Sequence, residues 1–166
     1  MAKKYPLEQL AFIKKKKLDE AERILRDKRE ELLTEQKKLT KVEKARDEVK
    51  KHKLEKLQQL RDAMDEGERA DKIEQGRHYL KLVEEKLIIE EKKVTAQKEQ
   101  VKKAEEAVEA ARQDMLKRQK EVEKFKEHKE LWRKEMLKEI EKEEAKEADE
   151  IGSSRFTLRK RKQEGE

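Results

Sequence analysis

Residues 73–122, IEQGRHYLKLVEEKLIIEEKKVTAQKEQVKKAEEAVEAARQDMLKRQKEV, decide the fold of this chain. Every seventh residue in this stretch is apolar. These positions are Ile73, Leu80, Leu87, Val94, Val101, Val108, Met115 and Val122. An apolar residue at every seventh position stays on one side of a slightly underwound helix, which can then wrap around a partner helix. The stretch therefore predicts a long coiled-coil helix.

A second set of positions lies between those of the first. Five of them are apolar: Val83, Ala104, Ala111, Phe125 and Trp132. Three polar residues, Glu90, Gln97 and Arg118, interrupt the set. The two sets together form the a and d positions of a coiled coil, which we call the seam of the second helix.

The composition supports a coiled coil rather than a globular domain. Of the 166 residues, 53% are charged, 33% are hydrophobic and 4% are aromatic, which is too little apolar material for an ordinary core. Such a composition also occurs in disordered chains. The strict seven-residue period instead favours a long helix.

The first half of the chain carries a seam of its own. Its positions are Leu7, Ala11, Leu18, Ala21, Leu25, Leu32, Leu39, Val42 and Val49. Further on, Arg46 and Lys53 fall at seam positions, and the next apolar residues are Leu54, Leu57, Leu60 and Met64. This change predicts a stutter in the register.

Residues 65–72, DEGERADK, separate the two seams. Gly67 suits a helix end that needs a positive φ, and Asp71 followed by Glu74 resembles a capping box. We expect an all-α fold, a long two-helix antiparallel coiled-coil hairpin with its tip near residue 68. Leu32 should then lie near Ala104.

The expected boundaries are a helix over 6–64, a turn at 65–71 and a helix over 72–150. Residues 1–152 would form one domain, and 153–166 a flexible basic tail. The hairpin predicts a monomer in isolation. One continuous, parallel dimeric rod is the alternative.

No pattern in the chain points to catalysis. Cysteine is absent, the four glycines are scattered, and His52, His78 and His128 lack metal-ligand spacing. We therefore expect no enzyme activity, cofactor, metal or small-molecule substrate. The net charge of +6 comes from interleaved signs, so no nucleic-acid partner is expected. Neither an apolar secretory leader nor a membrane-spanning run is recognisable, which predicts a cytoplasmic protein.

Apolar residues outside the seams, together with a few neighbouring seam and polar residues, are candidates for partner binding. One set, which we call the open-end surface, consists of Leu7, Leu10, Phe12, Ile13, Lys14, Leu131, Trp132 and Leu137. Packing of Leu7 and Phe12 on Phe125 and Trp132 would explain part of this set equally well. A second set, the tip surface, is His52, Tyr79 and Leu82. Basic residues also gather near the N-terminus, as lysines, and in 155–162, where there are five. This charge either keeps the protein soluble or guides the chain into an acidic site on a partner.

Several short motifs resemble one known family. They are Tyr5-Pro6-Leu7-Glu8, Ile13-Lys14-Lys15, Ala21-Glu22, Lys51-His52, the run HKELWRKE at 128–135, and Asp149-Glu150-Ile151-Gly152. Over nearly its full length the chain resembles the type III secretion stalk proteins (YscO, with flagellar FliJ as a distant relative), and most of all the chlamydial-type members.

This resemblance implies a hairpin similar to the central shaft of rotary ATPases. It implies a bacterial cytoplasmic protein at the inner-membrane secretion apparatus, whose open-end surface enters a secretion ATPase hexamer and whose tip surface meets the export gate protein. Some members bind secretion chaperones, so an escort that recycles chaperones is the alternative function. Nucleic-acid binding through the basic tail is a third hypothesis.

Overall fold

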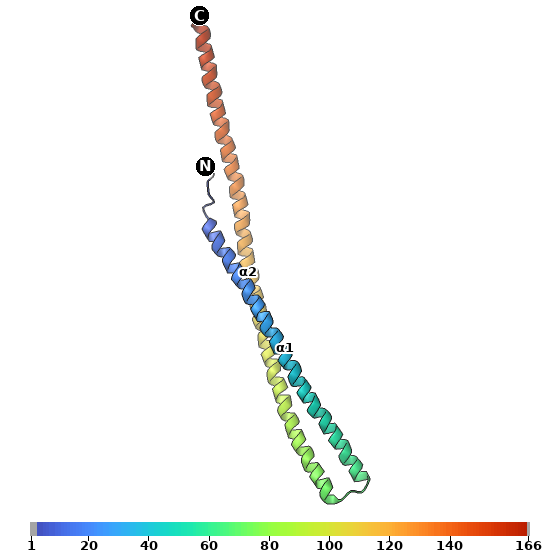
Figure 1. Ribbon diagram of the computed structural model, residues 1–166. Coiled ribbons are helices and arrows are strands. Elements are labelled where there is room, and N and C mark those ends of the chain that lie inside the picture. The colour runs from blue at the N-terminus through green and yellow to red at the C-terminus, as the bar shows by residue number, and fades with distance from the viewer. Residues whose placement is uncertain (1–2, 166) are drawn as a thin grey trace. The chain divides into compact units, whose positions relative to one another are not determined.

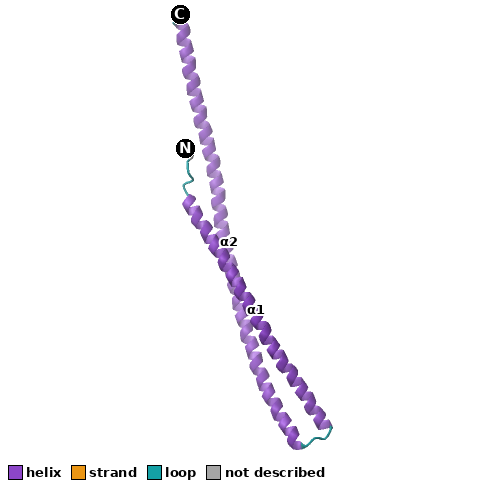
Figure 2. Ribbon diagram, in the orientation of Figure 1, coloured by secondary structure: helices purple, strands orange, loops and turns teal. Residues whose placement is uncertain are grey.

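The computed structural model describes residues 3–165, which form two long helices and no strand. Helix α1 spans Glu8–Asp65 and helix α2 spans Ala70–Glu164. A short loop joins them (Figures 1 and 2). The two helices form an antiparallel hairpin, so the predicted fold class is confirmed.

The hairpin divides into two compact units. Unit 2 spans Glu20–Met115 and contains the tip, whereas unit 1 contains the chain up to Asp19 and from Leu116 onward. In unit 2, Gln97 on α2 bonds to Glu35 on α1, and Glu84 pairs with Lys53. A higher residue number on α1 thus pairs with a lower number on α2, as predicted for antiparallel helices. The assignment of 1–152 to a single domain stays a prediction.

The seam of α2 agrees with the sequence pattern at every position from Ile73 to Trp132. All members of both sets are buried or half-buried, including the polar Glu90, Gln97 and Arg118. Gly76 also occupies a seam position, and a Cβ there would lie 2.9 Å from Cδ1 of Leu60. Glycine therefore leaves room for Leu60 in the seam near the tip.

The stutter predicted in α1 is wrong. Arg46 and Lys53 stay in the seam, half-buried, and their charged ends reach Asp47 at 3.0 Å and Glu84 at 3.5 Å. Leu54 is exposed instead. Long basic side chains can cover apolar surface with their stems while their charges reach carboxylates, so the register need not change.

Helix α1 ends at Asp65, and Gly67 just beyond it has the positive φ that was predicted. Gly67 has a φ of 75°, its N–H donates to the Met64 carbonyl at 3.2 Å, and the Glu68 N–H donates to the Ala63 carbonyl at 3.0 Å. These two bonds are the Schellman motif, which needs a left-handed residue at this position.

The predicted capping box at Asp71 is wrong. Helix α2 begins at Ala70, and the Arg69 carbonyl accepts the bonds from Lys72 and Ile73. Asp71 therefore lies in the first turn, where its charge suits the helix dipole and pairs with Arg69 at 3.3 Å.

The predicted end of the second helix near Glu150 is also corrected. Helix α2 continues through Gly152 to Glu164, and Arg161 and Lys162 lie in its last turn, where positive charge suits the dipole. One glycine costs only about 1 kcal/mol in a helix interior, so it need not end the helix. Residue 166, at the end of the predicted tail, lies outside the described residues.

The polar seam residue Gln97 fixes one point of the register. Its side-chain amide donates to the backbone carbonyl of Glu35 at 3.1 Å and to the carboxylate of the same residue. The hydrogen bond from Gln97, followed by that from Lys38, holds the pKa of the Glu35 carboxyl below its ordinary value. A hydrogen bond to the charged form favours that form.

We predict that Gly67→Ala lowers the free energy of unfolding by about 1 kcal/mol, because an L-residue in the left-handed region is strained. Urea denaturation followed by circular dichroism measures the change. Gly152→Ala is the control, since Gly152 lies within α2 with open space around it and should not destabilise. Equal stability of Gly67→Ala and the wild type would contradict the role of this turn.

Leu25→Ala should destabilise the hairpin by about 2 kcal/mol or more, because it removes a buried seam side chain. Leu33→Ala is the matched control on the same helix and should change stability by less than about 0.5 kcal/mol. Leu25 is 5% exposed and Leu33 is 57% exposed. Similar losses for the two variants in thermal unfolding would argue against the seam.

The lowered pKa of Glu35 predicts a pH effect. The charged carboxylate contributes stability above its ordinary pKa of 4.5, and this contribution is lost as pH falls through the lower folded-state pKa. Between pH 5 and pH 3, Gln97→Leu should therefore lose less stability than the wild type. Identical pH profiles from chemical denaturation would show that this hydrogen bond does not contribute.

Candidate functional site

An aromatic cluster closes the two-helix packing in unit 1. Tyr5, which precedes α1, is only 5% exposed. Its ring meets Trp132 edge-on with 5.4 Å between centroids, and its hydroxyl is hydrogen-bonded to Nδ1 of His128 at 2.5 Å. We call residues 3–7 the strap, because Tyr5 ties this segment to α2.

Two ion pairs join the first turns of α1 to α2. Lys129 contacts Glu8 at 2.8 Å and lies 5.8 Å from the centre of the Tyr5 ring. Further along α1, Lys14 pairs with Glu121 at 3.2 Å. The hydrogen bond from Lys14 holds the pKa of the Glu121 carboxyl below its ordinary value. These contacts fix the start of α1 against α2.

The predicted open-end surface divides into packed and exposed residues. Lys14 and Trp132 are half-buried and take part in the helix pairing described above. The other six are exposed: Leu7, Leu10, Phe12, Ile13, Leu131 and Leu137. Leu7 and Phe12 would be buried if they packed on Phe125 and Trp132, as the alternative interpretation required. The residue that packs on Trp132 is Tyr5 instead.

A shallow groove lies beside the start of α1. Phe12 and Phe125 both line it, together with Glu8, Ala11, Lys15, Val122, Lys126 and Lys129. Phe12 is 58% exposed, and the ammonium of Lys16 lies 4.7 Å from the centre of its ring. Apolar side chains ringed by lysines are therefore accessible at this end of α1.

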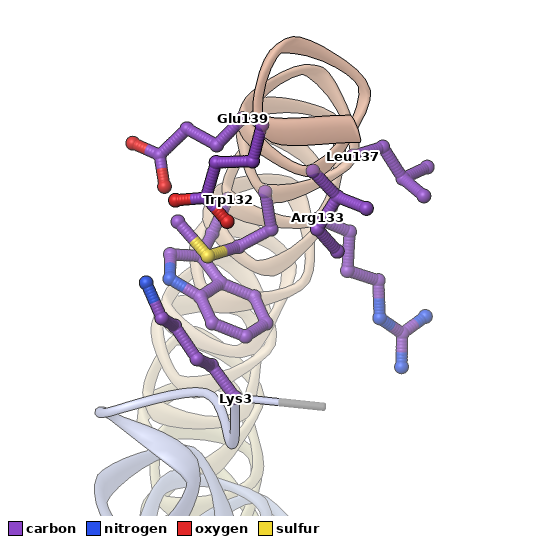
Figure 3. Close-up of a pocket in the computed structure, with 8 residues that line it drawn as sticks. Lys3, Trp132, Arg133, Leu137 and Glu139 are labelled. Atoms are coloured by element: carbon purple, nitrogen blue, oxygen red, sulfur yellow. The ribbon is translucent and has the colours of Figure 1, made fainter. Parts of the chain in front are cut away.

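A second groove lies on α2 next to the strap, and we call it the end groove. Its lining residues are Lys3, Trp132, Arg133, Met136, Leu137, Glu139, Ile140 and Glu143. Lys3 lies alongside the indole of Trp132, whereas Leu137 and Arg133 point to another side of the helix (Figure 3).

Sequence reasoning missed Tyr5, because the period of the seam says nothing about a residue that precedes the helix.

The structure brings the three residues of the tip surface together in unit 2. Nε2 of His52 is hydrogen-bonded to the Tyr79 hydroxyl at 2.9 Å, and the rings meet edge-on. Lys56 lies 5.7 Å from the centre of the Tyr79 ring. Tyr79 and Leu82 remain exposed and line a shallow groove with Asp71, Glu74, Gln75 and His78. Whether this surface binds a partner stays a prediction.

Residues 3–165 contain no group of three or more histidine, cysteine, aspartate or glutamate side chains placed to hold a metal ion. Within the same residues, neither helix has a stretch that is long and apolar enough to cross a membrane.

Comparison with known proteins gives two matches. The family model described as YscO-like protein matches residues 2–162. The solved structure of CT670 from Chlamydia trachomatis, a candidate YscO homologue, is similar with a TM-score of 0.91 and 43% sequence identity, over 96% of this chain and 99% of CT670. No curated protein matches.

The family match covers nearly the whole chain, and the similar structure agrees with it in fold over almost the same length. Proteins of this family are structural components associated with type III secretion. The chain belongs to the YscO-like protein family.

Proposed function

We propose that this chain is a non-enzymatic stalk of a bacterial type III secretion system, which couples the secretion ATPase hexamer to the export gate. It would act in the cytoplasm, at the inner-membrane secretion apparatus. Two observations support the proposal: the match to the YscO-like family, and exposed apolar side chains in both units of the hairpin.

The first turns of α1 carry the proposal. Leu10, Phe12 and Ile13 are exposed and lie outside the seam, so the hairpin does not need them for its own packing. Exposed apolar side chains of this kind commonly mark a protein interface. The adjacent residues Lys15, Lys16 and Lys17 are exposed as well. A partner pocket with an apolar floor and an acidic rim would complement this surface, and we assign that pocket to the ATPase hexamer.

The tip surface is the proposed contact with the export gate. Tyr79 and Leu82 present apolar area, and the bond between His52 and Tyr79 holds the aromatic ring in place. A side chain that is already oriented loses less entropy on binding. Helix α2 runs without a break from the tip to the open-end surface, so one element connects both proposed contacts.

An escort for secretion chaperones is the second candidate. Its support is a further set of exposed apolar residues near the tip surface, Ile88 and Ile89 on α2. Capture of purified secretion chaperones by the chain in the absence of the ATPase would favour this function. Capture of the ATPase without the chaperones would favour the stalk.

We predict that the chain binds the cognate ATPase hexamer and raises its rate of ATP hydrolysis. The triple variant Leu10→Ser, Phe12→Ser and Ile13→Ser should bind about tenfold more weakly or worse, because truncated interface anchors typically cost over 1 kcal/mol each. Circular dichroism should show unchanged helicity. The measurements are affinity by biolayer interferometry and phosphate release.

The matched control is Ile24→Ser, Leu33→Ser and Leu54→Ser, which removes three exposed apolar residues of α1 in unit 2. This variant should bind and stimulate like the wild type. If the wild-type chain neither binds nor stimulates the hexamer, the stalk function is wrong. Loss of helicity in the first variant would mean that Leu10, Phe12 and Ile13 stabilise the fold.

A further inference from the structure

We propose that the end groove holds an amphipathic α-helix of the partner, which runs antiparallel to α2 as α1 does. The inference rests on the proposed function for the identity of the partner, the ATPase hexamer. It adds the kind of element that binds, the position where it binds and its direction.

The end groove continues the interface between α1 and α2. The seven-residue period of the α2 seam passes from Val122 through Lys129 to Met136 and Glu143. Helix α1 begins at Glu8, which pairs with Lys129, and the strap covers Trp132 through Tyr5. The next seam positions along α2 therefore lie past the start of α1. A helix placed there would extend the same packing by further turns.

The floor of the end groove is apolar. Trp132 and Met136 are half-buried, and Ile140 is 47% exposed. Their spacing of four residues puts them on one face of α2. An amphipathic partner helix can pack its own apolar face against such a row of side chains. The groove can thus accept an amphipathic helix by the packing rules that form the hairpin.

The charges at the two ends of the end groove set the direction. Lys3 lies at the end near the strap, whereas Glu139 and Glu143 lie at the far end. A helix carries partial positive charge at its N-terminus and partial negative charge at its C-terminus. The favoured helix therefore starts beside Glu139 and Glu143 and ends beside Lys3, which is the direction of α1.

The test compares the ATPase affinity of full-length variants. Ile140→Asp should weaken binding about tenfold or more, because it places a charge where an apolar side chain would be covered. Ile151→Asp is the matched control on the same helix, 53% exposed and outside the end groove, and should bind like the wild type. Glu139→Lys with Glu143→Lys should also weaken binding, whereas Glu147→Lys with Glu150→Lys should not.

Oxidative footprinting by mass spectrometry locates the contact. Trp132 is the only tryptophan of the chain and lines the end groove, beside the readily oxidised Met136. Both residues should lose modification when the ATPase hexamer is added. Protection of both residues by self-association of the chain alone would overturn the assignment to the ATPase.

The outcomes separate this inference from the proposed function. If the wild type fails to bind the hexamer, the stalk function and the assigned occupant are both overturned. If the wild type binds while Ile140→Asp binds equally well, the end groove is not the contact and the stalk function stands. Equal losses for Ile140→Asp and Ile151→Asp would also overturn the inference.

Discussion

Packing of side chains at every seventh position between α1 and α2 is the interaction on which the rest of the structure depends. More than half of the residues are charged, so the chain has little other apolar material to bury. Buried residues such as Leu25 and Val94 belong to this seam. Because each helix completes the other, the chain supplies its own coiled-coil partner. What remains exposed is then available for other proteins.

The polar residues in the seam give the hairpin its register. Gln97 reaches both the backbone and the side chain of Glu35, and Lys53 reaches Glu84. Shifting one helix past the other would break such pairs, whereas aliphatic contacts could re-form at the next turn. A polar residue at a seam position commonly specifies register at some cost in stability. This explains why the repeat tolerates Gln97 where leucine would pack better.

Sequence reasoning predicted the hairpin because heptad periodicity and one left-handed glycine suffice to specify it. It misjudged Arg46 and Lys53, since it treated a charged residue in the seam as a break in register. It missed the strap, because Tyr5 packs through a tertiary contact that no local period encodes. The exposure of Leu10 and Ile13 agrees with their positions outside the seam, whereas the sequence left open whether Phe12 packs on the second helix.

The candidate site was harder to predict than the fold for a physical reason. Trp132 has a seam position, and only the structure reveals that Tyr5 covers one side of it while the end groove opens beyond. Leu137, by contrast, is exposed as the pattern indicated. The exposed residues in both units are consistent with a protein that joins two partners, which is the function proposed for this member of the YscO-like family.

Sedimentation equilibrium tests most directly the claim that the first half of the chain is the partner of the second half. We predict the monomer mass of 20.0 kDa at every protein concentration, with helicity that does not change on dilution. An intramolecular seam cannot depend on concentration. A mass of twice this value, with helicity lost on dilution, would contradict the hairpin and favour the parallel dimeric rod.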